Sequence, residues 1–193
     1  MEMFYSLQGE GFHQGKAAFF IRLAGCDVGC VWCDVKESWY TAHYPTYTAT
    51  ALAQEASRYP ARMAIITGGE PTLYDLRPLC QALHQQGFQV HLETSGAHAL
   101  LGEIDWICVS PKKFKPPLDE VCRQAHELKI IIYHAADFAW AETYARQVPA
   151  SCKLYLQPEW SRRQQMIPAI ISYIQQHPQW ELSLQLHKYV QIP

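Results

Sequence analysis

Short apolar segments rich in β-branched and aromatic residues recur along the chain and alternate with longer amphipathic segments. The short segments predict strands at residues 17–23, 63–67, 89–93, 106–109, 129–133, 153–156 and 182–186. The last strand belongs to an alternating run, 182–189, which we expect to lead back towards the other strand ends. The longer segments predict helices at residues 48–58, 75–86, 119–127, 137–147 and 162–177. Pro168 lies within the last helix and predicts that this helix begins later.

The alternation of strands and helices predicts an α/β fold with a parallel sheet and right-handed βαβ units. Nearly continuous apolar strands, such as the one with Ile130, Ile131 and Ile132, indicate burial on both faces of that sheet. A complete eight-fold barrel needs about 250 residues, and this chain has 193. An open sheet or an incomplete barrel therefore fits the length. No linker divides the chain, so we expect one domain spanning residues 1–193.

Glycine and polar residues cluster directly after five of the predicted strands. The clusters are Gly25-Cys26, Gly68-Gly69-Glu70-Pro71, Thr94-Ser95-Gly96, Ser110-Pro111-Lys112 and Gln157-Pro158. In both candidate folds, ligands bind at the carboxyl ends of the strands. We therefore expect the five clusters to form one site.

The composition argues against several classes of protein. There are 16 Lys and Arg against 18 Asp and Glu, and the resulting net charge of −2 is unlike that of a non-specific nucleic-acid binder. Hydrophobic residues make up 49%, which is enough for a folded core. No apolar run approaches the roughly 20 residues that span a bilayer, and the first residues do not form a secretory signal. We expect a soluble cytoplasmic protein that binds neither membranes nor nucleic acid.

Three of the seven cysteines, Cys26, Cys30 and Cys33, lie in the segment GCDVGCVWCD with the spacing C-x3-C-x2-C. In a reducing compartment, such a cluster more often binds metal than forms disulfides. A structural zinc site and an ordinary iron–sulfur cluster each take four protein ligands. Three cysteines leave one iron of a cubane open, which suits a catalytic centre. The alternative is a zinc site completed by His13 or His43. We assign no role to the remaining cysteines, Cys80, Cys108, Cys122 and Cys152, which are expected to be small buried residues.

The cysteine motif, with Trp32 before its last cysteine, resembles that of the radical S-adenosylmethionine superfamily. The GGEP segment at residues 68–71 resembles the second motif of that superfamily. A narrower resemblance covers nearly the whole chain and points to the 7-carboxy-7-deazaguanine synthases of queuosine and deazapurine biosynthesis. It rests on EMFYSLQGEG at residues 2–11, FFIRLAGCDVGCVWCD at 19–34, the ordered motifs TGGEP, ETSG, VSPK and LQP, and LHKYVQIP at 186–193.

The resemblance implies a shortened, partial (β/α) barrel that forms a single radical S-adenosylmethionine domain and acts as a homodimer. The implied activity is that of a carbon–nitrogen lyase, which converts 6-carboxy-5,6,7,8-tetrahydropterin to 7-carboxy-7-deazaguanine with loss of ammonia. A 4Fe-4S cluster, reduced by a donor such as flavodoxin or ferredoxin, would cleave S-adenosylmethionine. The resulting 5′-deoxyadenosyl radical would take a hydrogen atom from the substrate and later return it. Cofactors supply such chemistry, while the protein orients the reactants and excludes water.

The resemblance also implies roles for individual residues, with no catalytic side chain beyond the cluster and the cofactor. Cys26, Cys30 and Cys33 match the cluster ligands. The expected S-adenosylmethionine contacts are Trp32, Gly69, Glu70, Ser110, Pro111, Lys112, Gln157, Pro158, Glu159 and Trp160. The expected substrate contacts are Leu7, Gln8, Gly9, Glu10, Arg22, Thr67, His187 and Pro193. Arginine suits a carboxylate, and Gln and Glu side chains match the hydrogen-bonding edge of a pterin.

One position departs from the family pattern. Many members have Thr or Ser two residues after the last cysteine, where the hydroxyl binds Mg²⁺, and this chain has Val35 there. Mg²⁺ prefers oxygen ligands, which valine lacks. The ion would have to bind through substrate, water or Asp34, or a cation such as Lys36 would replace it. Mg²⁺ is therefore the one cofactor of the family pattern whose usual side-chain ligand is missing from this sequence.

Two functions of other classes compete with this one. An iron–sulfur electron carrier would have no use for the glycine-rich and lysine segments that follow the strands. A radical activase, which takes hydrogen from a glycine of a partner protein, would need an open groove for a polypeptide. The terminal segments favour a closed site for a small molecule.

Overall fold

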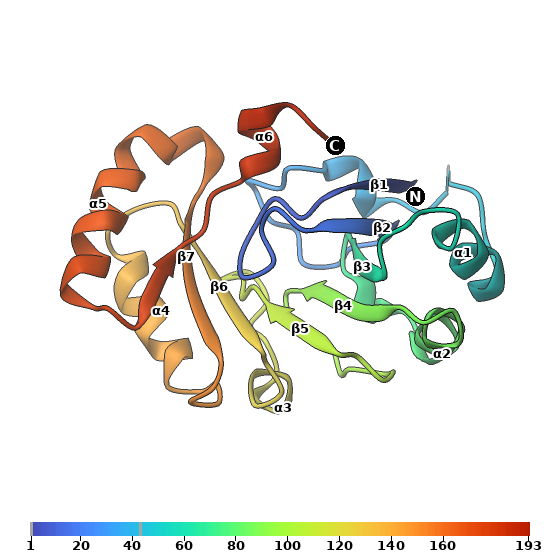
Figure 1. Cartoon of the computed structure of the whole chain (residues 1–193). Coiled ribbons are helices and arrows are strands. Elements are labelled where there is room, and N and C mark those ends of the chain that lie inside the picture. Colours follow the sequence, from blue (N-terminus) through green and yellow to red (C-terminus); the bar gives the residue numbers. More distant parts are fainter. Residues whose placement is uncertain (1, 43) are drawn as a thin grey trace.

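One eight-stranded sheet, curved into a partial barrel, organises the chain (Figure 1). The computed structural model describes residues 2–42 and 44–193. The strands follow one another in chain order: β1 (Glu2–Leu7), β2 (Ala17–Leu23), β3 (Met63–Gly68), β4 (Gln89–Thr94), β5 (Trp106–Val109), β6 (Glu127–Ile132), β7 (Lys153–Pro158) and β8 (Trp180–Leu182). β1 pairs antiparallel with β2, and every later pair is parallel. The expected α/β fold with an incomplete barrel is confirmed.

Helices connect most of the parallel strands and cover the outer face of the sheet (Figure 1). They are α1 (Ala49–Ala56), α2 (Arg77–Gln85), α3 (Asp119–Cys122), α4 (Asp137–Ala145), α5 (Arg163–Gln176) and α6 (Leu186–Val190), with the 3-10 helices η1 (Lys36–Trp39), η2 (Pro71–Leu73) and η3 (Trp160–Arg162). α6 differs from the others because it lies against the loop after β1, where the Leu186 amide donates to the Gly9 carbonyl at 2.8 Å. No helix among the described residues is long and apolar enough to cross a membrane.

Alternation along the strands separates an apolar outer layer from a mixed interior. Leu92 of β4 and Ile130 of β6 are buried in the cores that the strands form with the outer helices. Their chain neighbours point the other way, since successive strand residues face opposite sides. Glu93, Lys129 and Ile131 accordingly line an interior cavity. The strands are buried on both faces, as predicted. Unlike the outer face, however, the inner face carries charged side chains such as Glu93 and Lys129.

Several predicted elements have different bounds in the structure. Strands 17–23 and 106–109 are correct, whereas β1 was not predicted, because EMFYSL carries no clear alternation. The predicted helix 119–127 is too long: α3 ends at Cys122, and Glu127 begins β6, where it pairs with Lys153. The prediction that Pro168 delays the last helix is also wrong. α5 begins at Arg163 and continues through Pro168, which has no amide N–H and therefore leaves one hydrogen bond of the helix unmade without ending it.

The predicted strand 182–186 is wrong in all but its first residue. β8 ends at Leu182, and residues 186–190 form α6. The apolar residues Leu186, Tyr189 and Val190 are spaced i, i+3, i+4, a pattern that fits a helix as well as the assumed alternation. The chain therefore returns to the strand ends through a helix.

Candidate active site

A cavity at the carboxyl ends of the parallel strands, here called the rim cavity, brings together residues from all five predicted clusters. Its wall includes Cys26, Gly68, Gly69, Glu70, Thr94, Ser95, Ser110, Lys112, Gln157 and Pro158, together with Cys30, Trp32, Cys33, Glu159 and Trp160. Pro111 is the one expected cofactor contact that is not among its lining residues. The parallel register places these loops side by side, as open α/β sheets and (β/α) barrels generally do.

The cysteine loop and the glycine turn after β3 form one unit. The Gly69 amide donates to the Leu23 carbonyl at 3.0 Å, and the Glu70 amide donates to the Gly25 carbonyl at 2.8 Å. A Cβ atom on Gly69 would lie 2.2 Å from the Gly25 oxygen and 2.9 Å from Cys26 Cβ. Only glycine permits so close an approach. The two sequence motifs are therefore also one structural feature.

The three thiols line the rim cavity, with Cys30 buried and Cys26 and Cys33 half-buried. Burial raises the pKa of the Cys30 thiol, so a metal has to displace its proton. Among the described residues, no three His, Cys, Asp or Glu side chains surround a point that would hold a single ion. A cubane does not need such a point, because its cysteines bind different iron atoms. Three thiols beside an open cavity fit a 4Fe-4S cluster.

Several polar groups in the same wall fit a bound polar cofactor. Trp32 and Trp39 both line the cavity, and the Nε1 atom of each is buried without a hydrogen-bond partner. Buried donors are usually satisfied, so these two are open to a ligand. Lys112 Nζ donates to the Ser110 carbonyl at 2.5 Å and to Ser110 Oγ at 2.6 Å, and burial lowers the Lys112 pKa. The wall thus suits S-adenosylmethionine.

Glu70 ties two loops of the wall together. Its Oε1 accepts hydrogen bonds from the Thr72 amide (3.1 Å), Thr72 Oγ1 (2.6 Å) and Thr94 Oγ1 (2.6 Å). Its Oε2 accepts from the Ser95 amide (2.8 Å) and from Ser95 Oγ. Both oxygens of this buried carboxylate are therefore occupied. Glu70 positions the turn after β3 against the loop after β4, and its backbone is the part left to contact a cofactor.

A second cavity, here called the side cavity, adjoins the rim cavity. The two share Glu10, Asp34, Thr67, Glu93 and Gln185. All eight expected substrate contacts line the side cavity: Leu7, Gln8, Gly9, Glu10, Arg22, Thr67, His187 and Pro193. Phe4 and Phe20, which stack at 4.8 Å between ring centroids, complete an apolar part of its wall.

Three charged groups lie where the cavities meet. Lys129 Nζ lies 2.6 Å from Glu10 Oε2 and 2.8 Å from Glu93 Oε2. Burial raises the pKa of the Glu10 carboxyl, but Lys129 outweighs it and brings the value to about 2. Sequence analysis missed Glu93 and Lys129 as site residues. The signal that could have found them is a charge at an inward position of an otherwise apolar strand.

The end of the chain is part of the side cavity. Ser6 Oγ of β1 donates to the terminal Pro193 oxygen at 3.1 Å, and Figure 1 shows the carboxyl end beside β1. A Cβ atom on Gly9 would lie 2.2 Å from His187 Nδ1, so the loop after β1 and α6 are in close contact. The expected return of the chain to the site is therefore found, although by a helix and not by a strand.

Arg22 lies on β2 beside Thr67 of β3, and both line the side cavity. Its Nε donates to Glu2 Oε1 at 2.5 Å, across the β1–β2 pair. This contact uses one edge of the guanidinium group. The guanidinium is planar, so fixing one edge also restricts the direction of the rest.

The residues around Val35 do not fit the Mg²⁺ site of the family pattern. Val35 lines the side cavity with a hydrocarbon side chain. The neighbouring Asp34 carboxylate already accepts from Lys188 Nζ at 2.6 Å and from Gln185 Nε2 at 3.0 Å. These two hydrogen bonds compete with a hard cation for the carboxylate oxygens. Lys188, and not the suggested Lys36, is the cation that this structure places on Asp34.

The zinc alternative gains no ligand from His13. That ring packs against His91 and Trp106, with centroids 4.5 Å and 4.6 Å apart. Trp106 begins β5, whereas the cysteines follow the end of β2. His13 therefore lies at the other end of the strands. His43 lies outside the described residues.

Comparison with known proteins gives the family of this chain. A family model described as the radical SAM superfamily matches residues 20–134. A 7-carboxy-7-deazaguanine synthase of Flavobacterium psychrophilum is 50% identical over 100% of this chain and 91% of its own length. One from Synechocystis sp. is 52% identical over 98% of this chain and 90% of its own length. A crystal structure of QueE from Escherichia coli matches with a TM-score of 0.86 and 33% identity, covering 96% of this chain and 92% of that one.

Proposed function

The chain belongs to the radical S-adenosylmethionine superfamily and, within it, to the 7-carboxy-7-deazaguanine synthase family, and we propose that it converts 6-carboxy-5,6,7,8-tetrahydropterin to 7-carboxy-7-deazaguanine with loss of ammonia. The reaction belongs to queuosine and 7-deazapurine biosynthesis, and residues 1–193 act as one domain.

The observation that carries the proposal is the pair of joined cavities. One has three cysteine thiols and unpartnered buried donors in its wall, and the other has an arginine, three carboxylates and the chain terminus. Because the two cavities share wall residues, a cofactor bound in the first would lie beside a substrate bound in the second. An electron carrier has no need of the second cavity, and a radical activase needs a groove for a polypeptide instead.

In the rim cavity, Cys26, Cys30 and Cys33 hold the cluster, and the turns at Gly69 and Ser110 support S-adenosylmethionine. When bound and reduced, the cluster and S-adenosylmethionine supply a 5′-deoxyadenosyl radical. The protein contributes the orientation of that cofactor and a wall that excludes water. The remaining proposed cofactor contacts are Trp32, Glu70, Lys112, Gln157, Pro158, Glu159 and Trp160.

In the side cavity, the guanidinium of Arg22 binds the substrate carboxylate, because a planar fork of donors matches that group. Gln8 and Glu10 bind the amino and amide edge of the pterin. The Pro193 carboxylate, held by Ser6, accepts further ring donors. His187 and Thr67 form further parts of the wall of the side cavity. These contacts fix the carbon that loses hydrogen relative to the cofactor, which is the main task of the protein in such catalysis.

The reaction needs a one-electron donor, and we propose a small reductant such as flavodoxin or ferredoxin. We also propose that the chain acts as a homodimer. Membership of the synthase family supports both proposals. Dimerisation is tested by sedimentation of the reconstituted protein, and the donor by its ability to support turnover.

The test of function is incubation of anaerobically reconstituted protein with reductant, S-adenosylmethionine and 6-carboxytetrahydropterin, followed by mass spectrometry. We expect 7-carboxy-7-deazaguanine and an equal amount of ammonia. An electron carrier would leave both small molecules unchanged. An activase would leave the pterin unchanged and transfer its radical only to a partner protein.

A further inference from the structure

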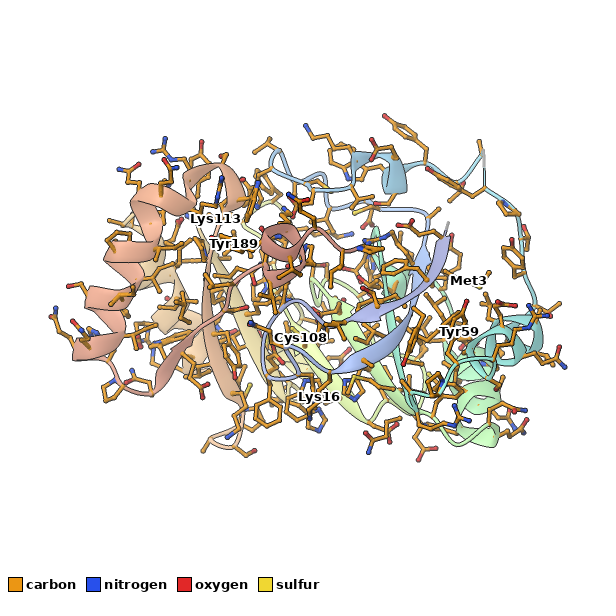
Figure 2. The ribbon with its side chains drawn as sticks, turned by 45° about the horizontal axis from the view of Figure 1, so that its top comes forward. Met3, Lys16, Tyr59, Cys108, Lys113 and Tyr189 are labelled. Atoms are coloured by element: carbon orange, nitrogen blue, oxygen red, sulfur yellow. The ribbon has the colours of Figure 1, made fainter. Side chains whose placement is uncertain are left out.

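A buried cation separates two carboxylates at the junction of the cavities. Lys129 of β6 is 4% exposed and lies within hydrogen-bond distance of Glu10 and Glu93. Cys108 of β5, labelled near the middle of the molecule in Figure 2, is the partner of Glu93 in the β4–β5 pair and marks this interior. Solvent therefore stabilises the charge of Lys129 much less than it would that of a surface lysine.

The neighbouring amide fixes the geometry of this group. Gln8 Nε2 donates to Glu93 Oε1 at 3.1 Å, and Gln8 Oε1 accepts from the Glu10 amide at 3.1 Å. Rotation of the Gln8 side-chain amide by 180° would therefore break both of these hydrogen bonds. Each carboxylate still has lone pairs beyond those used by Lys129 and Gln8, because an ionised carboxylate offers about four acceptor positions.

Without a cation, two carboxylates at one site do not both ionise, because like charges disfavour each other. One of them would keep a proton and could then donate a hydrogen bond as well as accept one. Lys129 donates to both carboxylates, so each presents its remaining lone pairs as acceptors. The lysine thus decides which kind of ligand edge the pocket accepts.

We propose that Lys129 is a specificity-determining residue, which holds Glu10 and Glu93 as acceptor-only carboxylates so that the pocket selects ligands with adjacent N–H donors. The 2-amino and lactam N–H groups of a pterin form such an edge. In a lumazine, oxygen replaces the 2-amino group, so a carbonyl oxygen of the ligand would face a carboxylate oxygen of the pocket and both would be acceptors. The inference rests on the proposed function and adds the discrimination between these two ring systems.

The test measures binding and needs no turnover. The probes are 6-carboxypterin and 6-carboxylumazine, whose oxidised rings have no hydrogen at the carbon that bears the carboxylate. Calorimetric titration of reconstituted protein with S-adenosylmethionine present gives both dissociation constants. We expect the unmodified protein to prefer the pterin by about tenfold or more, since a mismatched buried hydrogen bond costs at least that much.

Lys129→Met should abolish most of this preference, and Lys129→Arg should retain most of it. Lys153→Met is the matched control: Lys153 is on the neighbouring strand, is exposed and lies over the Phe12 ring. This variant should bind like the unmodified protein. If Lys129→Met does not fold, Lys129→Gln is the second variant: it keeps both carboxylates and a hydrogen-bond donor but removes the charge, and it should show the same loss.

The outcomes separate the two proposals. A Lys129→Met or Lys129→Gln variant that keeps the full preference for the pterin overturns the role of Lys129 alone. The same holds if the unmodified protein binds both compounds equally. An unmodified protein that binds neither compound and makes no deazaguanine overturns the proposed function and this inference with it.

Discussion

Of the three cysteines in the rim cavity, Cys30 is the buried one, and its thiol has no other role in the described structure. We expect reconstitution to load about four irons and four sulfides per chain, as a cubane requires. Cys30→Ala should abolish this loading, because a cubane held by three thiolates loses a ligand that nothing replaces. Iron analysis and the charge-transfer absorption measure the result.

Cys80→Ala is the matched control. Cys80 is also buried, but it lies in α2 within the outer core, away from the rim cavity. The iron–sulfur content and activity of the Cys80→Ala variant should equal those of the unmodified protein. Stoichiometric zinc without charge-transfer absorption would contradict the assignment of the cysteines.

Val35 decides the dependence on Mg²⁺. Its side chain offers no oxygen, and Asp34 is occupied by Lys188 and Gln185. We expect Mg²⁺ to stimulate turnover only weakly, and Val35→Thr to increase the stimulation by adding an oxygen ligand. Turnover with and without chelator measures both. A strict requirement for Mg²⁺ in the unmodified protein would show that other oxygens hold the ion.

At the level of elements, the carboxyl end of the chain contributes α6, through His187, and the terminal residue Pro193 to the wall of the side cavity. Deleting Pro193, or adding a tag after it, should raise the Michaelis constant for the pterin about tenfold, because a charge-assisted hydrogen bond of roughly 1.5–3 kcal/mol is lost. Ser6→Ala removes a hydrogen bond to the same terminal oxygen and should have a smaller effect in the same direction.

Iron content and cleavage of S-adenosylmethionine without substrate should stay unchanged in these variants, since the rim cavity does not include Pro193. Equal Michaelis constants for the tagged and untagged protein would show that the chain end is not part of the site.

The sequence was sufficient to predict the parallel strands and the loops that follow them. Apolar β-branched runs and glycine turns are local signals, and β2 and β5 match the predicted bounds. It was not sufficient for the end of the chain, where the same apolar residues fit a helix and a strand. It also missed Glu93 and Lys129, because their partner Glu10 is distant in sequence and only the folded barrel brings the three together.

At the scale of the whole molecule, Glu127 couples stability to pH. It is buried beneath the loop after β1 and accepts hydrogen bonds from the Phe12 amide (3.3 Å) and Trp106 Nε1 (3.1 Å). Burial, aided by the charge of Glu93, raises the Glu127 pKa to about 7. A carboxyl with a raised pKa in the folded state favours folding below its unfolded pKa. This contribution is lost as pH rises through about 7.

Glu127→Gln should therefore flatten the fall in stability on the alkaline side, since glutamine does not titrate. We expect the unmodified protein to lose roughly 2 kcal/mol of unfolding free energy relative to the variant between about pH 5 and pH 8. Urea unfolding at both pH values measures the difference. A difference that does not change with pH would mean that Glu127 titrates normally.

The most direct test of the central claim is the number of deazaguanine molecules formed for each molecule of S-adenosylmethionine consumed. In the proposed reaction, the hydrogen atom taken from the substrate is returned to it after ring contraction, so S-adenosylmethionine is regenerated. With S-adenosylmethionine limiting and 6-carboxytetrahydropterin in excess, we expect the yield of 7-carboxy-7-deazaguanine to exceed the amount of S-adenosylmethionine supplied. Conversion of S-adenosylmethionine to 5′-deoxyadenosine with no 7-carboxy-7-deazaguanine formed would contradict the account.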